Sequence, residues 1–350
     1  MKIGIFSKFE MAGGSERRCM EIARGINQYS NHEAIILCER NLPSSLRQDR
    51  EFECIENSFD NLEHFNSCDI IIVINTDSKD FTTANYWLGK SSRHDKSIGD
   101  GLNGKRIWFL FNFLVSPSRH LDELESMGAK VGIFTANKKF FDEITKQDRY
   151  EDVRALPRYQ LNSPIDPESV IQRIRGVGGD TLNIGFHSKG LGNKWNDEIP
   201  DLVKKVYDRY GESIRFSFMG IKSELRSCLS SCANVTCLSE NEISVKDFLN
   251  RLDLFMFFPS FKREEPWCRV IAEAMVSGLP VLATDKGGNP DQVLNGNNGF
   301  LCKRTDDFYK RIVEMKENPS IINIMSQNSI QISRDFTTEA VIKKMLGIIV

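Results

Sequence analysis

Two glutamates, Glu265 and Glu273, have the residue type and spacing that most clearly suggest chemistry. A loop carrying Glu265 follows the apolar segment 253–259, and Pro266 then opens a predicted helix that runs through Glu273 and ends at Gly278. This helix begins at the carboxyl end of a predicted buried strand, where its free N–H groups and dipole favour a pyrophosphate. Glu265 would lie just outside the helix end and Glu273 about two turns along it. One carboxylate can accept from sugar hydroxyls and the other from ribose hydroxyls, so the pair suits a sugar nucleotide.

The alternative for these glutamates is that Glu265 is a solvated loop charge and Glu273 a surface residue of the helix. Glu273, however, stands inside the apolar run 271–275, which predicts a mainly buried helix. An unpaired buried carboxylate is costly. The sequence therefore favours a binding role.

The elements that position these residues alternate between strands and helices. In the first half, the predicted strands are Lys2–Phe6, Glu33–Cys38, Asp69–Asn75, Arg106–Val115 and Lys130–Thr135. In the second half, they are Leu182–His187, Ile214–Gly220, Asn234–Leu238, Leu254–Phe258, Pro280–Thr284 and Gly299–Cys302. Helices between them predict two doubly wound α/β domains, over 1–168 and 178–335, with a ligand cleft between them. A last helix in 336–350 could serve either half and is expected to pack back on the first domain.

The segment from Glu265 onward resembles a known donor-site motif. Glu265-x7-Glu273, with Glu273 opening Glu-Ala-Met-x-x-Gly-x-Pro-Val-x-Ala-Thr-Asp-x-Gly-Gly, is similar to the motif of retaining glycosyltransferases of the GT-B fold, closest to family 4 (glycosyl transferases group 1). The resemblance extends through the second domain and more weakly through the first. It implies two Rossmann-like domains facing a central cleft, the first on the acceptor side and the second holding a nucleotide-sugar donor.

The resemblance also implies roles for residues around the motif. Glu273 would bind the ribose and Glu265 the donor sugar. The amides of Trp267, Cys268 and Arg269 would face the sugar and the diphosphate, and Gly287 would lie on the donor side. The family often has Glu-Gly-Phe-Gly where this chain has Glu265-Pro-Trp-Cys. Trp267 would then shape the donor pocket differently, the alternative being plain core packing.

Two lysines follow the first strand of the second domain, in Gly185-Phe-His-Ser-Lys-Gly-Leu-Gly-Asn-Lys194. The family carries an Arg and a Lys here that clamp the donor diphosphate, and Lys189 and Lys194 keep the same separation. A cation at a phosphate leaving group stabilises the charge that develops in the transition state. At the Arg position, Lys189 would lose bidentate geometry. The alternative for both lysines is a solvated loop.

Candidates in the first domain are fewer. Gly13 and Gly14 lie between the first strand and the first helix, where glycine allows close approach of a ligand. A tight turn is the alternative, and the pattern is not the Gly-x-Gly-x-x-Gly of a NAD site. The resembling family often has a catalytic His after strand 69–75, where this chain has none. His120, after strand 106–115, is the remaining candidate base, although a lone His is more often structural.

Composition and charge exclude several classes. A formal net charge of −2 and a 40% apolar content argue against a disordered chain and against a nucleic-acid binder that works by bulk charge. The sequence contains no apolar segment of transmembrane length and no signal-peptide pattern. We therefore expect a cytoplasmic protein, with peripheral association at the inner face of a membrane left open. The nine scattered cysteines indicate reduced thiols, and the group of Cys228, Cys232 and Cys237 lacks zinc-ligand spacing.

The resulting expectation is a retaining glycosyltransferase that moves a hexose-type sugar from a UDP- or GDP-sugar. The acceptor would be a glycan, a glycolipid or another hydroxyl compound. No Asp-x-Asp occurs, so no metal and no other cofactor is expected. Two alternatives stay open: an epimerase or hydrolase of the same fold, and a non-catalytic nucleotide-sugar-binding protein.

Overall fold

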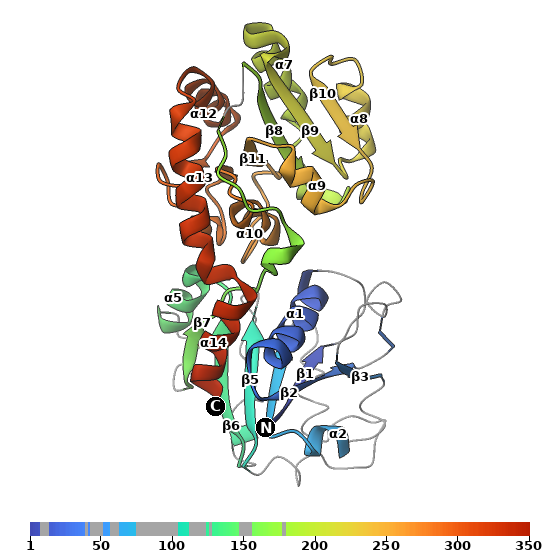
Figure 1. Ribbon diagram of the computed structural model, residues 1–350, viewed down its shortest axis with the longest axis vertical. Helices are drawn as coiled ribbons and strands as arrows, with labels where there is room; N and C mark the ends of the chain where they lie inside the picture. Colours follow the sequence, from blue (N-terminus) through green and yellow to red (C-terminus); the bar gives the residue numbers. More distant parts are fainter. Residues whose placement is uncertain are drawn as a thin grey trace. The chain divides into compact units, whose positions relative to one another are not determined.

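The chain forms two compact units in a computed structural model (Figure 1). One unit comprises Met1–Pro164 with Thr338–Val350, and the other comprises Ile165–Thr337. The structure describes residues 1–7, 14–38, 41–42, 52–56, 63–74, 104–111, 124–125, 128–146, 156–176 and 180–350. Within these ranges, no helix is both long enough and apolar enough to cross a membrane.

The first unit is built on a seven-stranded parallel sheet with the order β3-β2-β1-β4-β5-β6-β7. Its strands are β1 (Lys2–Ser7), β2 (Glu33–Cys38), β3 (Glu53–Ile55), β4 (Ile70–Ile74), β5 (Arg106–Phe111), β6 (Lys130–Thr135) and β7 (Arg158–Gln160). The helices described here are α1 (Gly14–Tyr29), α2 (Glu63–Asn66), α5 (Lys138–Lys146) and α14 (Thr338–Ile349). The five strands expected from sequence are all present, and the short β3 and β7 extend the sheet at its two edges.

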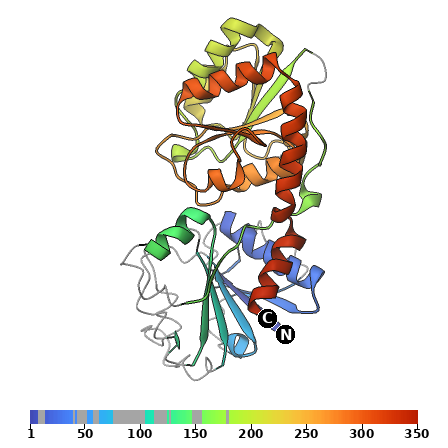
Figure 2. The ribbon, with the colours of Figure 1, turned by 90° about the vertical axis from the view of Figure 1, so that its left-hand side faces the viewer.

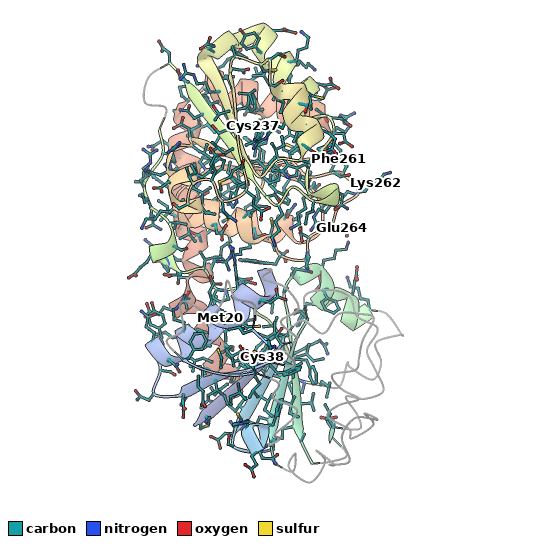
Figure 3. The ribbon with its side chains drawn as sticks, turned by 90° about the vertical axis from the view of Figure 1, so that its right-hand side faces the viewer. Met20, Cys38, Cys237, Phe261, Lys262 and Glu264 are labelled. Atoms are coloured by element: carbon teal, nitrogen blue, oxygen red, sulfur yellow. The ribbon has the colours of Figure 1, made fainter. Side chains whose placement is uncertain are left out.

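Both faces of this sheet are buried, which explains its continuous apolar strands. Side chains alternate between the faces, so Ile3 and Ile5 of β1 enter one apolar core and Phe6 enters the other. Helices α1 and α14 cover the face of Ile3, where Met20 of α1 and Cys38 of β2 also lie (Figure 3). The C-terminal helix thus belongs to the first unit, although the chain reaches it only after completing the second.

The second unit is built on a six-stranded parallel sheet with the order β10-β9-β8-β11-β12-β13. Its strands are β8 (Leu182–His187), β9 (Ile214–Met219), β10 (Val235–Leu238), β11 (Leu254–Phe257), β12 (Val281–Thr284) and β13 (Gly299–Cys302). This is the order of a doubly wound nucleotide-binding sheet. The chain winds outward in opposite directions from the neighbouring strands β8 and β11. Ligands bind at such a switch point, outside the carboxyl ends of the strands.

Helices lie on both faces of this second sheet (Figure 2). They are α7 (Ile199–Tyr210), α8 (Ser223–Leu229), α9 (Val245–Asn250), α10 (Arg269–Val276), α11 (Asn289–Gln292), α12 (Thr305–Glu317) and α13 (Ser320–Ser333). Helix α13 is absent from the sequence-based expectation. Its sequence, SIINIMSQNSIQIS, is rich in isoleucine, serine and asparagine, which are weak helix formers. Packing against α10 stabilises it instead.

Arg175 fixes the start of the second unit to its helices. Its side chain is buried, and it donates to the carbonyls of Asn250 (3.2 Å) and Ser277 (3.1 Å), at the ends of α9 and α10. Its backbone N–H donates to Ser326 Oγ of α13 at 2.6 Å. Burial lowers the pKa of Arg175 to about 10, so the guanidinium remains charged at neutral pH. One cation therefore serves two helix C-termini, where positive charge is favourable.

Replacing Arg175 with alanine should destabilise the second unit by about 2–3 kcal/mol, since charged hydrogen bonds are lost from a buried site. We expect the calorimetric Tm to fall by about 2–4 °C for each kcal/mol. Arg215→Ala, at an exposed side chain of the same unit, is the matched control and should change stability by less than about 0.5 kcal/mol. Equal Tm values for the two variants would contradict this role of Arg175.

Candidate functional site

Two loops meet at the switch point of the second sheet. One follows β8 and carries Lys189 and Lys194, and the other follows β11 and carries Glu265. Asn193 and Asn196 join the loops: the N–H of Ser260 donates to the carbonyl of Asn193 at 3.1 Å, and the N–H of Asn196 donates to the carbonyl of Phe258 at 3.2 Å. The two loops therefore form one connected platform at the carboxyl edge of the sheet.

The loop after β8 is anchored by Trp195. This buried indole packs on Phe186, with ring centroids 4.4 Å apart, and its Nε1 donates to the carbonyl of Lys189 at 3.0 Å. Lys194 ends the short 3₁₀ turn Gly192–Lys194 and is partly exposed. Its Nζ forms no hydrogen bond or ion pair with any residue that the structure describes. The loop thus presents an ammonium group that is available to an anion.

Glu265 is held through its backbone by the Gly-Gly turn after β12. The N–H of Gly288 donates to the carbonyl of Glu265 at 2.8 Å. Gly287 has φ +56°, and a Cβ there would lie 2.2 Å from the carbonyl oxygen of Glu265. Only glycine fits that approach and that backbone conformation. The close approach of Gly287 to the Glu265 carbonyl therefore positions the loop that carries Glu265.

Helix α10 begins at Arg269, so the expectation that Pro266 opens it is wrong by three residues. The cause is a buried clamp from α11. Gln292 Oε1 accepts from the N–H of Cys268 at 2.9 Å, and Gln292 Nε2 donates to the carbonyl of Cys268 at 2.9 Å. This pairing holds Cys268 in an extended conformation, with φ −96° and ψ 104°. The Cys268 amide, expected to face the sugar and diphosphate, is therefore bonded to Gln292 in this structure.

Glu273 consequently lies about one turn from the start of α10 rather than two. Its side chain is only 8% exposed. Oε1 accepts from Arg269 Nε at 2.7 Å, and Oε2 lies 3.7 Å from Nε2 of His187, the last residue of β8. Two cationic or polar groups thus offset the cost of burying this carboxylate. Sequence reasoning did not select His187, although its place at the carboxyl end of a strand is a signal that could have found it.

Trp267 lies in the core of the second unit, against Phe336 near the end of that unit at Thr337. Its ring meets Phe336 edge-on, with centroids 5.8 Å apart and planes at 85°. The side chain is buried, and its Nε1 has no hydrogen-bond partner in the described part of the chain. This buried contact agrees with core packing, the alternative that the sequence left open for Trp267.

Burial raises the pKa of the neighbouring Cys268 thiol well above its usual value.

The first-unit candidates are largely outside the described ranges. Gly14 is the first residue of α1. Gly13 and His120 lie outside the described residues. All nine cysteines are free thiols, and no group of three His, Cys, Asp or Glu side chains suited to a metal occurs among the described residues.

Two doubly wound parallel-sheet units, one with charged loops at its switch point, define the GT-B fold, and comparisons with known proteins agree. Residues 215–332 match the family model described as "Glycosyl transferases group 1". The chain is 25% identical over 114 residues to Spore coat protein SA of Bacillus subtilis (strain 168), covering 29% of each protein. It is 31% identical over 87 residues to Uncharacterized glycosyltransferase MJ1178 of Methanocaldococcus jannaschii, covering 24% of each. The matches thus span less than a third of these relatives.

Solved structures resemble nearly the whole chain. A glycosyltransferase from Rickettsia africae ESF-5 has a TM-score of 0.77 at 12% identity, covering 99% of this chain and 97% of that one. Anabaena Alr3699/HepE in complex with UDP has a TM-score of 0.73 at 14% identity, covering 99% of each chain. At such identities the likeness establishes the GT-B fold. Together with the family match, it supports a transferase.

Proposed function

We propose that this protein is a retaining glycosyltransferase that moves a hexose-type sugar from a UDP- or GDP-sugar to a hydroxyl of a glycan, a glycolipid or a smaller acceptor. The observation that carries the proposal is the platform at the switch point of the second sheet, which joins Glu265 to the available ammonium of Lys194. Residues 215–332 also match a glycosyltransferase model. The solved Anabaena neighbour was crystallised with UDP and with UDP-glucose, which supports a nucleotide-sugar ligand.

In the proposed reaction, the donor diphosphate lies at the start of α10 with Lys194 and Lys189 nearby. The bond between the anomeric carbon and the phosphate oxygen breaks, and a bond from the acceptor oxygen to the same carbon forms on the same face. The acceptor proton passes to the leaving phosphate oxygen, and the nucleoside diphosphate is released. Lys194 stabilises the charge that builds on the diphosphate, Glu265 holds a sugar hydroxyl and Glu273 the ribose.

The proposed site uses cationic side chains and a helix end instead of a metal ion, because the sequence contains no Asp-x-Asp. We place the reaction in the cytoplasm, with a lipid-linked acceptor at the inner face of a membrane as one option. To test that the site needs no metal ion, the transfer assay is run with excess EDTA as well as with Mg²⁺ or Mn²⁺.

Thermal-shift screening against UDP, GDP, ADP and their sugars, followed by transfer assays on the ligands that bind, tests the function. A ligand at 100 times its Kd stabilises the protein by about 2.7 kcal/mol. Binding of a nucleotide sugar and transfer to an added acceptor, in EDTA, support the proposal. Turnover without any acceptor would point to the epimerase or hydrolase alternative. Binding without turnover would point to a non-catalytic protein. Transfer that is lost in EDTA and restored by a metal ion would contradict the metal-free site.

Replacing Glu273 with glutamine should mainly raise the KM for the donor, by about tenfold, because a charged hydrogen bond to the ribose contributes about 1.5–3 kcal/mol. This contact is similar in the ground and transition states, so kcat should stay within about twofold. Glutamine keeps the volume of the buried side chain, and Glu212→Gln, at an exposed position, is the control. Steady-state kinetics with varied donor measures both constants, and a fall in kcat at unchanged KM would contradict the ribose role.

A further inference from the structure

Arg263 binds the candidate sugar-binding carboxylate directly. It lies in the loop after β11, and the side chains of Arg263 and Glu265 are each 22% exposed. Arg263 Nε donates to Glu265 Oε1 at 2.7 Å, and Nη2 donates to the same oxygen. A guanidinium remains charged at any physiological pH. The pair is therefore a partly buried, charge-assisted contact and not a loose surface ion pair.

The geometry treats the two oxygens of Glu265 differently. Both guanidinium contacts reach Oε1, whereas Oε2 forms no hydrogen bond with the residues that the structure describes. An ionised carboxylate accepts at about four lone-pair positions. The two contacts with Arg263 hold Oε1 in place, and Oε2 keeps its capacity to accept from a ligand hydroxyl.

The far side of the same guanidinium reaches the second loop of the platform. Arg263 Nη1 donates to Asn193 Oδ1 at 2.7 Å, and Asn193 directly precedes Lys194. Arg263 thus spans the loop of Glu265 and the loop of Lys194. The neighbouring Lys262 is exposed and points away from the unit (Figure 3). Of these two adjacent cations, only Arg263 faces the platform.

We propose that Arg263 is a positioning residue: it holds Oε1 of Glu265 so that Oε2 meets a hydroxyl of the donor sugar, and it keeps this carboxylate in register with Lys194. The inference rests on the proposed function and extends it to a residue that touches no substrate. A planar guanidinium with two donors suits this task, because a lysine at the same place would supply a point charge without two donors in a fixed geometry.

The test is a double-mutant cycle on kcat, with Arg263→Ala, Glu265→Ala and the double variant. We expect Arg263→Ala to lower kcat by about 10–100-fold, the range for a misplaced reacting group, and Arg263→Lys to recover only part of that loss. In the Glu265→Ala background, Arg263→Ala should change kcat by less than about twofold, because its effect passes through Glu265. Lys262→Ala, the matched control, should retain wild-type kinetics.

A second readout separates positioning from simple support of the loop. In the proposed binding mode, UDP or GDP without its sugar does not reach Glu265, so Arg263→Ala should leave nucleotide affinity within about twofold. The proposal is overturned if Arg263→Ala keeps wild-type kcat, if its loss is equally large without Glu265, or if affinity for the bare nucleotide falls as much as kcat. Should Arg263→Ala misfold, Arg263→Lys carries the same cycle. Failure of the wild-type protein to bind any nucleotide sugar refutes the proposed function itself.

Discussion

Glu265→Ala is expected to lower kcat by about 10²–10³, the loss seen when one preorganised electrostatic group is removed. In the proposed reaction, Glu265 lies beside the sugar whose bond to phosphate breaks, so its interaction strengthens as positive charge develops on the ring. The structure prepares it for this role through Arg263 on one oxygen and Gly287 and Gly288 at its backbone. Because those contacts exist before any ligand arrives, little reorganisation accompanies the reaction.

Steady-state kinetics on purified Glu265→Ala, after circular dichroism confirms folding, measures this effect. Glu212→Ala is the control, since it removes an exposed carboxylate that precedes β9 and so lies at the amino end of a strand, away from the carboxyl ends that form the platform. A kcat for Glu265→Ala close to that of Glu212→Ala would remove Glu265 from the account.

Lys194→Ala is expected to produce a loss in kcat of the same size, about 10²–10³. The diphosphate gains charge as it leaves, and the ammonium of Lys194 has no competing partner among the described residues. Its loop is fixed by Trp195 and by the backbone link to Ser260, so the charge is already in place. Since the loss falls on the transition state, kcat and kcat/KM should decrease together.

Lys262→Ala is the matched control for Lys194→Ala, because it deletes an exposed lysine from the adjoining loop. Lys194→Arg should recover part of the rate, since the charge is restored with altered geometry. Retention of the wild-type kcat by Lys194→Ala would mean that the leaving group lies elsewhere.

Periodicity along the chain predicted the two sheets well. Strands buried on both faces form continuous apolar runs, and β2, β6, β8 and β13 occupy the predicted residues. Helix α14 (Thr338–Ile349) likewise lies within the predicted segment 336–350. Helix α13 was missed because tertiary packing, and not helix propensity, stabilises it.

The details of the site depend on contacts between distant residues, which periodicity does not encode. Gln292, 24 residues along the chain in α11, delays the start of α10 by pairing with the backbone of Cys268. His187 meets Glu273 only because β8 and β11 are neighbours in space. The sequence did not single out Arg263, whose contact with Asn193 joins residues 70 positions apart and depends on the fold.

The measurement that tests the central claim most directly is a crystal structure of the protein with the nucleotide sugar that gives the largest thermal shift. The account predicts the diphosphate at the start of α10, about 3 Å from Lys194 Nζ, with a sugar hydroxyl on Glu265 Oε2 and the ribose on Glu273. A nucleotide sugar bound away from the carboxyl ends of β8 and β11, with Glu265 and Lys194 untouched, would contradict it.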